Sequence, residues 1–450
     1  MRLNHYKDLL KLGFPIIIGQ LGTIILGFAD TLMIGHHTMP ELAAASFVNS
    51  LFSLIFVISL GFTNGLTPII GGHYGRGESA SIALVLKNAI AVCGLLAAVL
   101  FSVMTVVYFC LGHLGQPESL LPLMRPYFLI QLVSLPFVVA FNMMKQFSDG
   151  MLRTQTGMWI VLAGNLLNIL GNWLLIYGHW GLPEMGLTGA GLSTLFSRVL
   201  MALFFMGVLG WSSHYKEVRS HLKSVRVERK EMRRITALGV PLALQIGMET
   251  SAFQLSSIIV GWIGVSALAA NQIVMVASQF CYFISLGMAV AVSIRVSLYY
   301  GQGDYQGVRA NVRAGLVLVF ILLAITGSVV WTVRWKLGGW FTTGGDVTRL
   351  VALTVIPLLV YQVSDGVQNT FANTLRGLSH VKVLVPVAFL AYFVVTLPLC
   401  YVFGITLGGG LVGIWWAFFF GLSIAAVLFV REYLKVMKRV GQGLKSESRE

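Results

Sequence analysis

Long apolar segments make up most of this chain, and they restrict its fold more than any other feature does. Each is at least as long as the roughly 20 residues that a helix needs to cross a bilayer. Only 11% of the residues are charged, against about 25% in ordinary soluble domains. We therefore predict an all-α polytopic membrane protein. The twelve expected transmembrane helices lie at residues 12–36, 42–71, 85–112, 121–145, 158–178, 187–211, 235–262, 268–298, 310–333, 347–374, 383–404 and 410–431.

The basic residues orient these helices. The chain has 31 Lys and Arg against 17 Asp and Glu, a net charge of +14. All but Arg125, Arg334, Lys336 and Arg349 can be assigned to one side of the membrane when the twelve helices alternate, and the positive-inside rule makes that side the cytoplasm. In this assignment Arg198 counts among the cytoplasmic charges, and no Lys or Arg lies deep in a span. Both termini are then cytoplasmic, and we expect no nucleic acid partner.

A polar stretch at 212–234 divides the helices into two sets of six. We expect an N-terminal lobe at 1–211, a basic cytoplasmic linker at 212–234, a C-terminal lobe at 235–433 and a cytoplasmic tail at 434–450. The linker is predicted to be solvated and to touch anionic headgroups. A regulatory or lipid-binding role for this stretch is the alternative.

The two sets of helices form an internal repeat. At a constant shift of 226 residues, glycine and proline positions coincide without a gap: Gly13 and Pro15 meet Gly239 and Pro241, and Tyr74, Gly75 and Gly77 meet Tyr300, Gly301 and Gly303. A shift by six helices leaves both copies in the same orientation, so the repeats are parallel. Parallel repeats are typical of transporters with a site near the membrane midplane. A duplicated scaffold without transport activity is the alternative.

Three acidic residues lie inside predicted helices, namely Asp30, Glu249 and Asp365. A carboxylate at the bilayer centre costs about 2.5–3.5 kcal/mol on insertion scales, and such groups usually face a cavity and serve an ion or proton pathway. The alternative is a protonated carboxyl group that hydrogen-bonds to a neighbouring helix. The repeat does not duplicate these acids, because Asp30 aligns with Ser256 and Asp365 with Asn142.

Polar residues are expected around each acid. Gln20, Asn168, Asn172 and Thr194 are the candidate partners of Asp30, and Asn168 and Asn172 share one helix face. Oxygen ligands of this kind suit a hard cation or a proton relay. Tyr361 and Asn369 lie one turn before and one turn after Asp365. The Tyr361 ring could hold a cation, or it could simply pack.

Several catalytic motifs are missing from the sequence. There is no Gly-Lys pair for a phosphate-binding loop, and neither His-Glu-x-x-His nor Gly-x-Ser-x-Gly occurs. We therefore expect no enzyme activity, no cofactor and no nucleotide, and transport would draw its energy from an ion gradient or from a partner.

The sequence resembles the multidrug and toxic compound extrusion (MATE) family, in its bacterial NorM-type branch, over essentially the whole chain. The stretches that carry the resemblance are LGFPIIIGQ, GFADTLMIG, ELAAASF, NILGNWLLIYG, GAGLSTLFSR and YQVSDGVQNTFANTLRG. The resemblance implies a V-shaped two-lobe transporter in the bacterial inner membrane. It also implies an antiporter, acting as a monomer, that exports cationic amphiphilic drugs and dyes in exchange for Na⁺ or H⁺.

The resemblance also suggests roles for individual residues. Asp30 matches the first-lobe cation site, with Asn168, Asn172 and Thr194 as its partners, although some members have an acid where this chain has Asn172. Glu249 and Asp365 match the second-lobe acids, and Tyr361 matches an aromatic residue proposed to touch the bound cation, so a Na⁺ site is expected there. Pro15 matches a proline at which helix 1 bends in some members.

The coupling ion is left open between Na⁺ and H⁺, with a slight preference for Na⁺. Two other functions are weighed against the antiporter. A flippase for a lipid-linked sugar precursor shares the twelve-helix layout, but its cavity should be basic, whereas these buried residues are acidic. A non-transporting membrane scaffold would not need buried acids at all.

Overall fold

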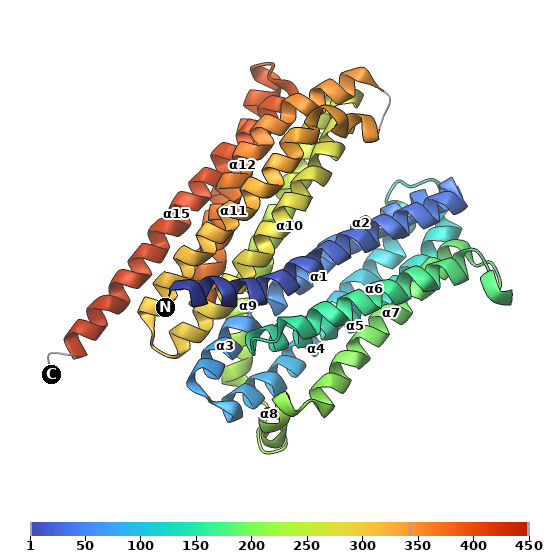
Figure 1. Cartoon of the computed structure of the whole chain (residues 1–450). Coiled ribbons are helices and arrows are strands. Elements are labelled where there is room, and N and C mark those ends of the chain that lie inside the picture. Colours follow the sequence, from blue (N-terminus) through green and yellow to red (C-terminus); the bar gives the residue numbers. More distant parts are fainter. Residues whose placement is uncertain (1, 342–343, 448–450) are drawn as a thin grey trace. The chain divides into compact units, whose positions relative to one another are not determined.

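The computed structural model describes residues 2–341 and 344–447, and every predicted transmembrane segment is helical over most of its length (Figure 1). The long helices are α1 Arg2–His37, α2 Met39–Thr63 continued by α3 Leu66–Arg76, α4 Ser79–Cys110, α5 Leu121–Gly150, α6 Thr154–Ile176, α7 Gly186–Trp211, α9 Arg229–Ile263, α10 Val265–Gly301, α11 Tyr305–Leu337, α12 Gly345–Gly377 and α15 Gly410–Glu447. One more helix spans Leu384 to Thr406, in which α13 Leu384–Ala388 and α14 Leu397–Tyr401 alternate with π-helical turns at Phe389–Thr396 and Val402–Thr406. Short helical turns occur at α8 Lys216–His221, Leu111–His113, Glu118–Leu120, His179–Gly181, Ser213–Tyr215 and Gly338–Trp340.

Eleven helical segments of the described chain are long and apolar enough to cross a membrane. The twelfth predicted span, α9, is more polar because it carries Gln245, Glu249 and Gln254. Its 35 residues still extend over about 50 Å, which exceeds the roughly 30 Å of the hydrocarbon core. The protein is therefore a multi-pass α-helical membrane protein, as the sequence predicts.

The internal repeat is visible in the helix boundaries. Helices α2 and α10 begin at Met39 and Val265, and α4 and α11 begin at Ser79 and Tyr305. Both pairs differ by the 226 residues that align the two halves of the sequence (265 − 39 and 305 − 79). Where the first half breaks its helix at Asn64 and Gly65, α10 is continuous.

The chain forms two compact units. The N-terminal unit is Ile18–Ala243, and the C-terminal unit combines Met1–Ile17 with Leu244–Glu450. The boundaries fall inside α1 and α9, two residues after Pro15 and two after Pro241. In the C-terminal unit α10, α11, α12 and α15 run alongside one another, and in the N-terminal unit α4, α5, α6 and α7 do so (Figure 1).

The N-terminal halves of α1 and α9 pack in equivalent ways, each against the unit to which it belongs. A Cβ atom on Gly61 would lie 2.7 Å from Ala243 Cα, and one on Gly287 would lie 3.0 Å from the Ile17 nitrogen. Both glycines and both partners are related by the shift of 226. Close glycine contacts of this kind are how membrane helices bring their backbones together.

A substitution at Gly61 tests this contact. Gly61→Ala is expected to destabilise the protein by about 1–3 kcal/mol, because the added methyl group would overlap the α9 backbone. Gly94→Ala on α4 is the matched control, since nothing lies within 4 Å of a Cβ atom there and alanine favours a helix by up to about 1 kcal/mol. Thermal unfolding in detergent should show a lower melting temperature for the first variant only, and equal melting temperatures would contradict the packing.

The polar segment 212–234 is held against the N-terminal unit. Lys87 Nζ on α4 donates to the carbonyl oxygens of Leu222 and Val225, at 3.2 and 2.6 Å. Asn88 Oδ1 accepts from the Glu228 nitrogen at 2.8 Å, and the Tyr215 and Ser148 hydroxyls lie 2.9 Å apart. Burial raises the pKa of the Tyr215 phenol. These contacts fix the backbone of the segment on α4 and α5.

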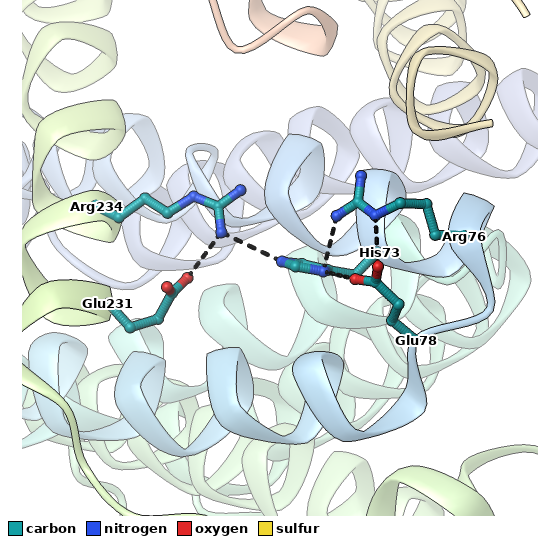
Figure 2. A network of polar contacts seen from close by, with 5 residues as sticks. All are labelled: His73, Arg76, Glu78, Glu231 and Arg234. Atoms are coloured by element: carbon teal, nitrogen blue, oxygen red, sulfur yellow. Dashed lines mark hydrogen bonds and ion pairs between the residues drawn. The ribbon is translucent and has the colours of Figure 1, made fainter. Parts of the chain in front are cut away.

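A second set of contacts joins the start of α9 to the end of α3 (Figure 2). Glu78 accepts from Arg76 Nε at 2.8 Å and pairs with His73 Nδ1 at 2.5 Å. Arg234 reaches His73 Nε2 at 3.2 Å and Glu231 at 3.3 Å. The hydrogen bonds from Arg76 and His73 lower the pKa of Glu78 to about 2, so this carboxylate stays ionised at any physiological pH.

Candidate functional site

The structure brings Asp30 on α1 together with three of its four predicted partners. Asn172 Nδ2 on α6 donates to Asp30 Oδ1 at 2.5 Å, and also lies 3.2 Å from Asn168 Oδ1. One orientation of the Asn168 amide satisfies both of its polar atoms. In that orientation its nitrogen donates to the same Asp30 oxygen at 2.8 Å, and its oxygen accepts from the Thr194 hydroxyl at 3.1 Å. Asn168 and Asn172 are fully buried, and Asn172 Oδ1 has no hydrogen-bond partner.

Gln20 is not part of this cluster. It precedes Asp30 by ten residues on the same helix, which places it about 15 Å away along the helix axis. Among the described residues it makes no hydrogen bond to Asp30, Asn168 or Asn172. Gln20 is polar and lies in the same helix as Asp30, but it is too far along that helix to belong to the Asp30 cluster.

The assignment of Arg198 to the cytoplasmic ends is wrong. Arg198 lies in the middle of α7, and its Nη1 donates to Gln131 Oε1 and Ser134 Oγ at 2.6 Å each. Its guanidinium carbon lies 4.7 Å from the centre of the Phe56 ring. Arg198 also interacts electrostatically with Asp30. A cation therefore does lie within the span, one helical turn after Thr194, and it partly balances the Asp30 charge.

The second cluster, in the C-terminal unit, contains the two other acids. Asn369 Nδ2 donates to Asp365 Oδ2 at 3.0 Å, whereas Asp365 Oδ1 is buried without a hydrogen-bond partner. Asp365 is fully buried, Glu249 is 6% exposed, and the two carboxyl groups interact electrostatically. Neither forms an ion pair with a Lys or Arg in the described part of the chain. This cluster thus lacks the counter-charge that the first one has.

A cavity of about 240 Å³ opens beside Glu249 in the same unit. Tyr361 and Phe253 line it together with Ser278 and Tyr282 of α10. Tyr361 also packs edge-on against Phe253 and Trp415, with ring centres 6.4 and 5.6 Å apart. Its ring therefore both packs and borders the cavity. A small chamber with one acid and several aromatic rings suits an organic cation or a hard cation.

Two tyrosines beside Glu249 are not among the predicted site residues. The Glu249 carboxyl group interacts with the phenols of Tyr282 and Tyr392, although the buried Tyr392 oxygen makes no hydrogen bond of good geometry. Tyr392 lies in the π-helical turn Phe389–Thr396, which precedes Pro398. Pro398 cannot donate to the preceding turn, and π turns inside helices are often found at functional sites. No signal in the sequence singles out this turn, because Pro15, Pro126, Pro136, Pro241 and Pro357 lie inside regular α-helices.

Comparison with known proteins decides the family. The family model MatE matches residues 15–174 and again residues 241–402, so it covers both halves of the repeat. The chain belongs to the MatE family of membrane transporters. The probable multidrug resistance protein NorM of Rhizobium meliloti (strain 1021) is 28% identical over 97% of this chain and 95% of its own length.

Solved structures agree with this chain in fold. A multidrug resistance MATE family transporter of the MOP superfamily, in an outward-facing conformation, superposes with a TM-score of 0.89, 17% sequence identity and 97% coverage of both chains. A MATE structure in a bent conformation superposes with the same score and identity, covering 98% of this chain and 97% of that one. The twelve-helix fold predicted from the sequence is that of the MATE transporters.

Proposed function

We propose that this MatE transporter is an antiporter that exports cationic amphiphilic drugs and toxic organic compounds by alternating access, driven by Na⁺ or H⁺. The observation that carries the proposal is the pair of buried carboxylate clusters, because each offers an unpartnered oxygen, on Asn172 in one and on Asp365 in the other. A proton or Na⁺ can occupy such an oxygen-rich site. An organic cation that needs the same carboxylate must then leave, and this competition couples the two flows.

The relatives support the proposed substrate class, since the similar protein in Rhizobium meliloti carries the name of a multidrug resistance protein. The outward-facing state of a solved MATE transporter supports alternating access. The distribution of Lys and Arg supports cytoplasmic termini, and the bacterial NorM relative supports the inner membrane. We further propose that the protein acts as a monomer. A lipid-linked sugar flippase is less well supported, because the cavity beside Glu249 is lined by an acid and no base.

Ethidium efflux from everted vesicles tests this function. An imposed Na⁺ gradient and an imposed pH gradient are applied in turn, and one of them should drive accumulation of the dye by the wild type. Asp30→Asn and Glu249→Gln should each strongly reduce that accumulation. If neither gradient moves ethidium, or if both variants transport it as the wild type does, the antiporter assignment fails.

Pro15 is the proposed hinge. The boundary between the compact units crosses α1 two residues after Pro15, and a proline inside a helix removes one backbone hydrogen bond and allows bending. Pro241 occupies the equivalent position in α9, so we propose that both helices flex there. The bent state of a solved MATE structure is consistent with this role.

A further inference from the structure

A recess of about 540 Å³ lies between the first turns of α1 and α11 in the C-terminal unit. Its walls come from two segments that are some 300 residues apart in the chain, so the tertiary fold creates it. The residues lining it are His5, Tyr6, Gln306, Arg309, Ala310, Arg313 and Ala314. It contains none of the residues of the two carboxylate clusters, and the proposed transport cycle does not use it.

The recess is positively charged. Arg309 and Arg313 lie one helical turn apart, so they share a face of α11. Arg309 Nη2 reaches the Met437 carbonyl oxygen on α15 at 3.5 Å, and neither arginine forms an ion pair with a carboxylate within residues 2–341 and 344–447.

The acids of the neighbouring segments are already engaged. Asp8 on α1 pairs with Arg295 at 2.8 Å. Asp304 caps α11 by accepting from the Gly307 nitrogen at 2.8 Å. Among the side chains that the structure describes, two guanidinium groups therefore face the recess without a compensating negative charge.

The other side chains suit a phosphate. Tyr6 and Gln306 supply neutral hydrogen-bond donors, and His5 is positioned by Tyr299, whose hydroxyl lies 3.3 Å from His5 Nδ1. Ala310 and Ala314 lie on the same α11 face, and their small side chains also line the recess. Paired guanidinium groups bind phosphate oxygens in a bidentate manner that a single ammonium group cannot reproduce.

The depth of the recess favours a lipid as the source of the phosphate. Helix α11 has 33 residues, or about 50 Å, which exceeds the roughly 30 Å hydrocarbon core. Its apolar run begins at about residue 310, so both arginines lie where headgroups meet the core. Basic recesses at this level, between transmembrane helices, take up anionic headgroups.

We propose that this recess binds the phosphate group of an anionic membrane phospholipid, with Arg309 and Arg313 as its principal ligands. The proposal does not depend on the transport function, since it concerns residues at the end of the span. It predicts an annular lipid that stays bound when the bulk lipid is removed.

Native mass spectrometry of the full chain tests the proposal. The protein is released from nanodiscs of phosphatidylcholine doped with phosphatidylglycerol, and the bound lipids are counted. The wild type should retain phosphatidylglycerol in preference to phosphatidylcholine. Arg309→Gln with Arg313→Gln should weaken that retention roughly 30-fold, the effect of two basic residues at a membrane surface.

The matched control is Arg229→Gln with Arg233→Gln. These arginines are also exposed and one turn apart, at the start of α9, but they do not line this recess. They should leave retention unchanged. A folding control, Arg309→Lys with Arg313→Lys, keeps both charges and should retain an intermediate amount of lipid.

Three results would overturn the proposal. One is retention of phosphatidylglycerol by the glutamine double variant at the wild-type level. Another is an equal loss in the Arg229 and Arg233 variant, which would make the effect one of net charge. The third is displacement of the lipid by inorganic phosphate at concentrations comparable to those of the lipid, which would identify free phosphate as the ligand.

Discussion

Asp365→Asn is expected to lower gradient-driven ethidium efflux roughly 100-fold, within the range of coupling free energies known for linked sites. Asparagine has the shape of aspartate and can still contact Asn369, so packing should survive. It cannot carry the negative charge, and it replaces the unpartnered Asp365 Oδ1 with an atom that binds no proton and offers weaker coordination to Na⁺. The rate of dye movement in everted vesicles, normalised to the amount of protein, measures the effect.

Asp346→Asn is the matched control. Asp346 lies in the first turn of the same helix, α12, and is exposed, so its loss changes the net charge of the helix by the same amount at a position outside the cluster. It should transport like the wild type. Wild-type efflux by Asp365→Asn, or an equal loss in both variants, would contradict the role of Asp365.

The double variant Asp365→Asn with Glu249→Gln adds a further test. The two carboxyl groups interact electrostatically, and residues that act as one unit give effects that do not add. We therefore expect the double variant to be no slower than the slower single variant. Strictly additive losses would mean that the two acids act at separate sites.

The positions of the helices were predictable from the sequence because apolar length alone determines where a chain can span a bilayer. The contact of Asn168 and Asn172 with Asp30 was predictable for a different reason. A spacing of four residues places both amides on one face, and a buried carboxylate needs donors. Gln20 shows the limit of this reasoning, because a polar residue on the correct helix can lie several turns from the site.

Arg198 and Tyr392 were missed for physical reasons that differ. The positive-inside count assigns each basic residue to the nearest helix end. It therefore cannot detect a guanidinium group such as that of Arg198, which contacts Gln131, Ser134 and the Phe56 ring within the span. Tyr392 comes close to Glu249 from a π-helical turn, and a helix of regular period would have turned it to another face. Neither contact can be derived from spacing within a single helix.

The position of Arg198 implies that it sets how tightly Asp30 holds a coupling cation. A positive charge near Asp30 favours the ionised, empty carboxylate, so it promotes release of the proton or Na⁺. Arg198→Gln removes that charge. The variant should bind the coupling cation roughly tenfold more tightly, and it should reach half-maximal efflux at a correspondingly lower cation concentration.

Loss of packing alone would not produce this shift. Truncating the guanidinium group also removes its bonds to Gln131 and Ser134, which should cost about 1–3 kcal/mol of stability for each buried group left unpaired. That loss lowers the amount of folded protein, and it does not change the cation concentration at half-maximal efflux. Arg198→Lys keeps the positive charge near Asp30 but not the guanidinium geometry, so it should be destabilised while retaining the wild-type cation dependence. A cation dependence that is the same in the wild type and in Arg198→Gln would show that Arg198 serves only the packing of α5 and α7.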